Sequence, residues 1–257
     1  MIFDTHVHTR FSVDSQMNPE EAFKAASNAG LGVCVAEHVD FETDSDEPSL
    51  IDADEYFGAY GPYRSERFLL GMEIGLTVNT RAAGRKTASD PRMDFCIGSV
   101  HVSNGYDIYT PSFWQQDLPS EDILRGYLEY TMAAIEKCDF FDSLGHIDYP
   151  SRYSPRTVKN MDYKIFGKLF DQIFTALLDK RKVMEINTKR LGDRAAAQNL
   201  YEICEGYYDN GGRYVTLGSD AHKPASVGMG VREAYAMAKK IGLTPVHYNR
   251  REMITDA

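Results

Sequence analysis

The 257-residue sequence predicts an α/β protein whose parallel strands close into a barrel. Three observations lead to this fold class. Short apolar runs alternate with longer amphipathic stretches, which is typical of repeated β-then-α units. Seven or eight such units suit a closed barrel better than an open doubly wound sheet, and no glycine-rich dinucleotide fingerprint follows the first run. No break in composition divides the chain, so we expect residues 1–257 to form a single domain.

The apolar runs are the expected strands. They cover residues 2–7, 32–36, 68–74, 95–100, 140–145, 183–186 and 214–217, with a candidate eighth at 243–247.

The first helix is the best marked of the helical stretches. Asn18 can cap it, Pro19 suits its first turn, Glu21 completes a capping box and Gly30 ends it. Four further helices are expected at about 120–137, 162–181, 193–210 and 231–240. We expect loops over one mouth of the barrel in the polar segments 42–66 and 77–92 and in the aromatic-rich segment 105–119.

Composition excludes several functional classes. The formal charge of −10 and the absence of a basic stripe disfavour binding to nucleic acid. No apolar run approaches the ~18 residues that a membrane span needs, and the N-terminal residues do not resemble a secretion signal. The four cysteines form no CxxC pair, and most lie in apolar runs, which favours reduced thiols and a cytoplasmic location.

Histidines and acids follow the ends of the expected strands. His6 and His8 lie two residues apart on an extended segment, so their side chains share one face and can bind one ion. The other residues of this kind are Glu37, His38, Glu73, His101, His146, Asp220 and His222. In (β/α) barrels the carboxyl ends of the strands form the active site, and imidazole and carboxylate suit zinc, iron or manganese. The pattern therefore predicts a multinuclear metal site.

Each of these residues also has an ordinary structural explanation. Glu73 could pair with an arginine, and Asp14 or Asp220 could cap a helix or a turn. Taken together these explanations fail, because all the residues would have to fall on one barrel rim by chance. So many histidines and acids on one rim would also be electrostatically costly without a cation.

With these residues in this order, the chain resembles the polymerase-and-histidinol-phosphatase (PHP) superfamily over essentially its whole length. The resemblance implies a distorted, TIM-like (β/α)7 barrel, the PHP fold, with two or three divalent ions (Zn, Mn or Fe) at its C-terminal rim. The implied ligand sets are His6, His8, Glu73 and Asp220 for the first ion, Asp14, His38 and His222 for the second, and His101, His146 and a bridging Glu73 for the third. Several members have a histidine in place of Asp14, so the second set is more anionic here.

Four stretches are similar to the histidinol-phosphate phosphatase branch of that superfamily, namely residues 6–15, 37–40, 142–153 and 185–188. The implied function is a metal-dependent phosphomonoesterase that hydrolyses L-histidinol phosphate in histidine biosynthesis through a metal-bridging hydroxide. Glu73 would fix the spacing of two ions. Either Asp148 or His222, or a water molecule, could protonate the leaving group, and Asp148 could instead orient a ligand imidazole.

Arginines are expected to bind the phosphate group of the small substrate, because their planar fork can hold two oxygens. Three of them follow strand ends and could face the same mouth, Arg152, Arg190 and Arg194, and Arg10 follows the first histidine pair. The aromatic segment 105–119 could form a lid or a wall for the imidazole of the substrate, although simple packing explains it too.

Three alternatives stay open at this point. The chain could hydrolyse another small phosphate ester, such as a nucleotide or a sugar phosphate. It could be a barrel amidohydrolase, but no lysine ends a strand where those enzymes commonly bridge their metals. A non-catalytic metal-binding module ranks last, because the chain has no basic groove and no polymerase-sized extension.

Overall fold

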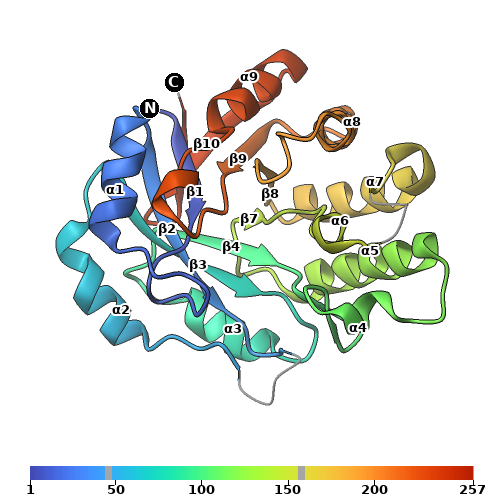
Figure 1. The fold of residues 1–257 in the computed structure, drawn as a ribbon, viewed down its shortest axis with the longest axis horizontal. Coiled ribbons are helices and arrows are strands. Elements are labelled where there is room, and N and C mark those ends of the chain that lie inside the picture. Colours follow the sequence, from blue (N-terminus) through green and yellow to red (C-terminus); the bar gives the residue numbers. More distant parts are fainter. Residues whose placement is uncertain (44–47, 156–159, 257) are drawn as a thin grey trace.

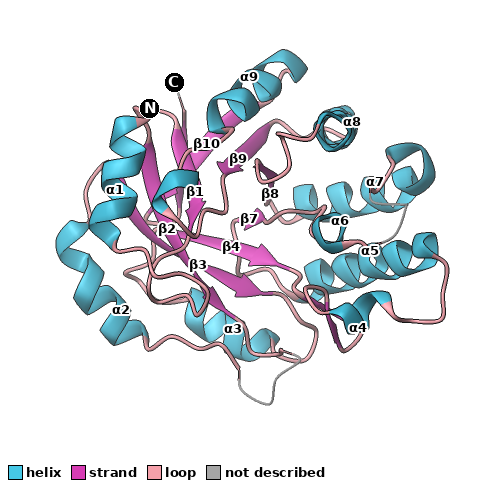
Figure 2. Cartoon of the chain, viewed as in Figure 1, coloured by secondary structure: helices cyan, strands magenta, loops and turns pink. Residues whose placement is uncertain are grey.

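The computed structural model describes residues 1–43, 48–155 and 160–256, and its core is a mostly parallel sheet surrounded by helices (Figures 1 and 2). Seven parallel strands pair in the order in which they follow along the chain. They are β1 (Phe3–Val7), β2 (Gly32–Val39), β3 (Phe68–Gly75), β4 (Phe95–Ser99), β7 (Ser143–Leu144), β8 (Val183–Asn187) and β9 (Tyr214–Gly218). The predicted α/β fold class is confirmed.

The end of β9 returns to β1 and brings the first and last of these strands together. Val7 and Ala221 form a parallel bridge. The amide of His8 donates to the carbonyl of Ala221 at 2.8 Å, and the amide of Asp220 donates to the carbonyl of His6 at 2.8 Å. This closure rests on a few backbone bonds instead of a full ladder, which agrees with the distorted barrel that the sequence led us to expect.

The candidate eighth run is indeed a strand, but it lies outside this ring. β10 (Thr244–Asn249) pairs with β9 through only two residues and then forms an antiparallel ladder with β11 (Glu252–Thr255). The segment is tied back to β1 by Asp256, whose buried carboxylate accepts from the amide of Phe3 at 3.1 Å and lies 2.6 Å from His247 Nδ1.

The five expected helices are present, with ends within two residues of those predicted. They are α1 (Pro19–Asn28), α5 (Ser120–Lys137), α7 (Tyr163–Asp179), α8 (Arg194–Asp209) and α9 (Val231–Ile241). Helix α7 shows why the pattern worked, because its residues at helical spacing, including Phe166, Phe170 and Ile173, are fully buried against the core. None of the helices that the structure describes is long and apolar enough to cross a membrane.

The segments expected to be loops also contain short helices. Segment 42–66, of which residues 44–47 lie outside the described chain, holds α2 (Ala53–Tyr60) and the 3₁₀ turn η1 (Gly61–Tyr63), and segment 77–92 holds α3 (Arg81–Ala88). Helix α2 has only 8 residues, of which Tyr56, Phe57 and Tyr60 are buried, and α3 buries only Gly84 and Ala88.

The third expected loop, 105–119, overlaps a small hairpin and a one-turn helix, and a similar short helix follows β7. These elements are β5 (Val102–Ser103), β6 (Tyr106–Asp107), α4 (Pro111–Trp114) and α6 (Pro150–Tyr153). Phe113 and Trp114 are buried in the core, whereas Tyr109 is 67% exposed. Ile108, Phe113 and Trp114 therefore anchor a largely exposed segment to the core, and Asp107 and Tyr109 reach the cavity at the mouth.

Candidate metal centre

Glu73, near the end of β3, is the centre of the predicted cluster. Its carboxylate is fully buried, and five imidazoles surround it. The nitrogen-to-oxygen distances are 2.7 Å for His146 Nε2, 2.9 Å for His38 Nδ1, 3.2 Å for His6 Nε2, 3.3 Å for His101 Nε2 and 3.5 Å for His8 Nε2. The predicted convergence of side chains from five separate strand ends is thus observed.

Strand geometry explains this convergence. His6 lies in β1 and His8 directly follows it, and both rings point to the same interior face, as the alternation of side chains along a strand requires. His38 and Glu73 sit opposite each other in the β2–β3 register. His101 and His146 follow β4 and β7 by two residues.

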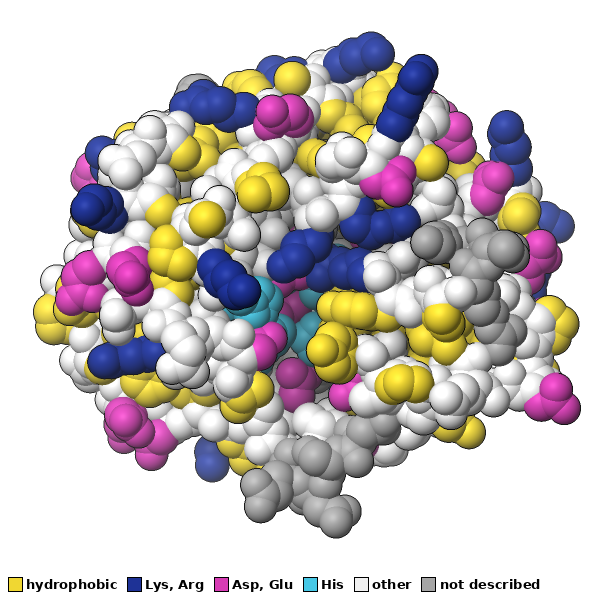
Figure 3. All heavy atoms as spheres, viewed as in Figure 1, with side chains coloured by type: hydrophobic (Ala, Val, Ile, Leu, Met, Phe, Trp, Pro, Cys, Tyr) yellow, Lys and Arg dark blue, Asp and Glu magenta, His cyan; other side chains and the backbone are white. Residues whose placement is uncertain are grey.

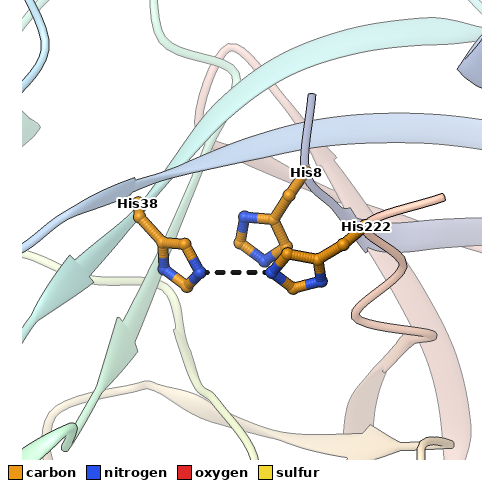
Figure 4. Close-up of side chains that lie close together, drawn as sticks. All are labelled: His8, His38 and His222. Atoms are coloured by element: carbon orange, nitrogen blue, oxygen red, sulfur yellow. Dashed lines mark hydrogen bonds between the residues drawn. The ribbon is translucent and has the colours of Figure 1, made fainter. Parts of the chain in front are cut away.

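A second group lies beside the first. His8, His38 and His222 point toward one another from β1, β2 and the segment after β9 (Figure 4), and the Nε2 atoms of His38 and His222 are 3.4 Å apart. Asp14, in the loop after β1, is about half exposed, and its Oδ2 lies 2.9 Å from His222 Nε2 and 3.6 Å from His38 Nε2.

The grouping differs in detail from the sets that the resemblance implied. Asp220 Oδ1 lies 3.4 Å from His8 Nε2, as the first implied set requires, but Asp220 also groups with His6 and His146. His8 lies close to the second set as well as to the first. The third set, Glu73 with His101 and His146, groups as implied.

Several nitrogen and oxygen atoms of the cluster that could bind a metal ion are buried and make no hydrogen bond with the described residues. They are Nε2 of His6, His8 and His101, Nδ1 of His38 and His146, and Oε2 of Glu73. Buried polar atoms are rarely left without a partner. A set of imidazole nitrogens and carboxylate oxygens converging within 4.8 Å of one another fits zinc, iron or manganese.

Burial and the neighbouring charges shift the pKa values of residues in the cluster strongly. Burial alone would raise the pKa of Glu73, but His6, His101 and His38 hold that pKa well below its ordinary value. Burial would lower the pKa of His6, and the carboxylates of Glu73 and Glu185 instead raise it well above the usual value. Burial and the neighbouring His38 lower the pKa of His8, which favours the neutral ring that a metal ion needs.

Carboxylates behind the imidazoles were not identified as site residues by sequence reasoning. Glu185 Oε1 lies 2.7 Å from His6 Nδ1, and Asp40 Oδ1 lies 2.9 Å from His101 Nδ1. Glu37, which the strand-end pattern included, faces away from Glu73 and accepts from Ser12 Oγ at 2.5 Å, while Ser12 Oγ lies 3.1 Å from His8 Nδ1. In the sequence, only their positions pointed to these two carboxylates. Asp40 follows His38 by two residues, and Glu185 is an acid inside an apolar run.

A cavity of about 350 Å³ opens over the cluster. Figure 3 shows it as a central hollow with histidine and acidic side chains at its floor and lysine and arginine side chains along one rim. Arg152 and Lys189 line the cavity, together with the aromatic rings of Tyr109, Tyr149 and Tyr153. The prediction that Arg152 faces this mouth agrees with the structure, whereas Lys189 was not singled out.

Four residues predicted to act on or bind the substrate are not among those that line the cavity, namely Arg10, Asp148, Arg190 and Arg194. Asp148 is buried and pairs with Arg190, whose Nη1 lies 3.1 Å from its Oδ2, and Arg190 Nη2 donates to Asn160 Oδ1 at 2.7 Å. Arg194 is the exposed first residue of α8. The expected contacts of these residues with substrate stay predictions.

Comparison with known proteins agrees with this geometry. The family model described as "PHP domain" matches residues 4–189. A "Probable histidinol-phosphatase" of Clostridium acetobutylicum is 36% identical over 98% of this chain and 99% of its own length, and a "Histidinol-phosphatase" of Lactococcus lactis is 28% identical over 93% of this chain and 91% of its own.

A solved structure extends the similarity to three dimensions. The crystal structure of histidinol phosphate phosphatase from L. lactis, complexed with zinc, L-histidinol and phosphate, has a TM-score of 0.89 and 27% identity, with 98% of each chain covered. The family match spans more than half of the residues, and the relatives match nearly all of them. This chain therefore belongs to the PHP domain family.

Proposed function

We propose that this chain is a divalent-metal-dependent phosphatase that hydrolyses L-histidinol phosphate to L-histidinol and phosphate. The observation that carries the proposal is the buried cluster around Glu73, which lies at the floor of a cavity with an arginine in its wall. The similarity to histidinol-phosphatases over nearly the full length of the chain supports the choice of substrate.

We assign the metal ligands from the cluster geometry. His6, His8, His101, His146 and Asp220 would contribute donor atoms around Glu73, and the second group would add the side chains of His38, His222 and Asp14. When bound, two or three zinc, manganese or iron ions would lower the pKa of water to about 7 and neutralise charge on the phosphoryl oxygens. Glu73, which contacts five of the imidazoles, would set the spacing between the ions.

Arg152 is our candidate for the phosphate contact. Its side chain is 7% exposed, its Nη1 pairs with Asp220 Oδ2, and its Nε and Nη2 have no hydrogen-bond partner among the described residues. Two free donors on one planar guanidinium match two oxygens of a phosphoryl group. The pair with Asp220 and the ring of Tyr149, 5.2 Å from Cζ, hold the guanidinium in place.

The geometry also bears on the roles that the sequence left open for Asp148, His222 and the aromatic residues. Because Asp148 is bound to Arg190, we propose that it holds that arginine and does not donate a proton to the leaving group. His222 Nδ1 lies 3.0 Å from the carbonyl of Asp220, so a proton there leaves Nε2 free to act as a ligand. Tyr109, Tyr149 and Tyr153 would form the wall against which the imidazole of the substrate packs.

The chemistry of the cysteines and the course of the chain support two further proposals. Cys34, Cys96, Cys138 and Cys204 are all free and buried, which fits a reducing, cytoplasmic location. Both ends of the chain contribute strands to one sheet, so we propose that residues 1–257 act as a single domain.

The decisive experiment compares substrates and a matched pair of histidine variants. The protein, stripped with chelator and reloaded with zinc, manganese or iron, should release phosphate from L-histidinol phosphate with a higher kcat/KM than from a nucleotide monophosphate or a sugar phosphate. His8→Ala should lose both metal and turnover, whereas His247→Gln, remote from the cavity, should keep both. Equal turnover of all the esters would contradict the substrate, and full activity of the stripped protein would contradict the metal centre.

A further inference from the structure

The two nitrogens of His101 face different groups. Nε2 lies 3.3 Å from Glu73 Oε1 and has no hydrogen bond, while Nδ1 lies 2.9 Å from Asp40 Oδ1. A neutral imidazole carries one N–H, and the carboxylate of Asp40 can only accept. The proton therefore belongs on Nδ1, and the lone pair of Nε2 points into the cluster.

The Asp40 side chain occupies a place that one glycine leaves open. Asp40 directly follows β2, its amide donates to the carbonyl of Ser49 at 2.8 Å, and its carboxylate lies over Gly75 at the end of β3. A Cβ atom on Gly75 would overlap Asp40 Oδ1, and the three nearest heavy atoms to that Cβ position, apart from the chain neighbours of Gly75, all belong to Asp40. Any larger residue at position 75 would push the carboxylate away from His101.

The same arrangement recurs across the barrel at His6. Its Nδ1 lies 2.7 Å from Glu185 Oε1, and its Nε2 faces Glu73 without a hydrogen bond. Glu185 lies in β8, and a Cβ atom on Gly218 of the neighbouring β9 would overlap both its Oε1 and the Cβ of His6. Glu185 also accepts from the amide of His146 at 2.8 Å through its second oxygen. Two imidazoles are thus held from behind by carboxylates that each need a glycine on the adjacent strand.

We propose that Asp40 is a positioning residue for the metal centre, that it acts by fixing the tautomer and orientation of His101, and that Gly75 is required because it makes room for the Asp40 carboxylate. Glu185 and Gly218 form the equivalent pair for His6. The inference rests on the metal centre of the proposed function. Carboxylates that accept from the outer nitrogen of a ligand imidazole raise its basicity and typically change metal affinity by about 10–100-fold.

Asp40 lines the cavity and groups with His38 and His101 in a set that could hold an ion, but its oxygens are placed less favourably than those of Glu73. Its Oδ1 is engaged by His101 Nδ1, on the opposite side of the ring from Glu73, and its Oδ2 lies 4.0 Å from His38 Nδ1. The Asp40 carboxylate is therefore one imidazole ring removed from the central carboxylate.

The test measures zinc affinity by competition with a chromophoric chelator, so it does not depend on turnover. Asp40→Ala should weaken the most affected zinc site by about 10–100-fold, and Asp40→Asn, which keeps an acceptor oxygen for Nδ1–H, should recover part of that loss. Gly75→Ala should resemble Asp40→Ala. Gly58→Ala is the matched control, because a Cβ atom on Gly58 of α2 would meet nothing within 4 Å, and its zinc affinity should equal that of the parent chain.

A double variant isolates the proposed cause. Once Asp40 is alanine, the nearest atom left to a Cβ on Gly75 is the Asp40 Cα at 3.7 Å, so Gly75→Ala should weaken zinc by less than about twofold further. Full additivity of the two changes, or parent-like zinc affinity in Asp40→Ala, would overturn the proposal. So would an anomalous difference map that places a zinc ion on Asp40.

Two controls distinguish the positioning role of Asp40 from a purely structural role and from the choice of substrate. The thermal midpoint of the chelator-stripped Asp40→Asn protein should equal that of the stripped parent, whereas a merely structural role would lower it. If the parent binds zinc with Asp40-dependent affinity but does not hydrolyse L-histidinol phosphate, the proposed substrate fails and the positioning role stands.

Discussion

Replacing Arg152 with methionine tests the proposed phosphate site most directly. The variant removes two charged donors, Nε and Nη2, that are buried without a partner among the described residues, on a side chain that lines the cavity. Each hydrogen bond from a charged group contributes about 1.5–3 kcal/mol, so two such bonds to the phosphoryl group amount to about 3–6 kcal/mol. At about 1.36 kcal/mol per tenfold change, kcat/KM should fall by about 10²–10⁴.

The assay must separate phosphate binding from damage to the metal centre, because Arg152 also pairs with Asp220. Metal content per chain is measured first, followed by kcat/KM and the inhibition constant of inorganic phosphate for the fully loaded protein. Arg152→Lys keeps the charge but loses the fork, so it should lie between the parent and Arg152→Met. Arg194→Met is the control, since Arg194 is exposed at the start of α8.

Two results would refute the proposed role of Arg152 in holding the phosphoryl group. If Arg152→Met keeps its metal and loses less than about tenfold in kcat/KM, the two donors do not hold the phosphoryl group. A loss of the same size in Arg194→Met would show that general charge, and not the geometry of Arg152, governs the reaction.

Three further predictions concern the cluster and the fold. Glu73→Gln removes the buried charge that five imidazoles share, and we expect elemental analysis to show fewer bound ions and phosphate release to be lost; normal metal content would contradict the central role of Glu73. Because Glu73 and Glu185 raise the pKa of His6 against the effect of burial, protons compete with metal for this ring, so zinc affinity should increase as pH rises from 6 to 8 in chelator titrations, and a flat profile would argue against the shift. Asp256→Ala leaves the buried amide of Phe3 without an acceptor, so urea unfolding should show a loss of about 1–3 kcal/mol while kcat/KM stays unchanged, since Asp256 lies away from the cavity.

The sequence was sufficient to predict the candidate metal ligands, because these residues lie at the ends of parallel strands. Parallel strands bring their carboxyl ends to the same edge, so residues such as His6, Glu73 and His146 had to meet once the strands were recognised. The apolar runs predicted the barrel, and the amphipathic stretches between them predicted its main helices. Helices α2 and α3 escaped because each has only 8 residues, and α3 buries just Gly84 and Ala88.

The carboxylates behind the ligand imidazoles could not be predicted from the sequence, because their contacts join residues that are far apart along the chain. Asp40 lies two residues after His38 in sequence but contacts His101, 61 positions away, and Glu185 contacts His6, 179 positions away. The direction of a long side chain after a strand is equally hidden. Arg152, in α6 after β7, lines the cavity, whereas Arg190, in the loop after β8, pairs with Asp148.

The junction between β1 and β9 has a consequence for biosynthesis. The backbone that fixes His6 and His8 belongs to Asp220 and Ala221, which are translated long after them. A nascent chain therefore carries these two imidazoles without the partners that hold them in place. The complete set of candidate ligands comes together only after β9 has been translated and has reached β1.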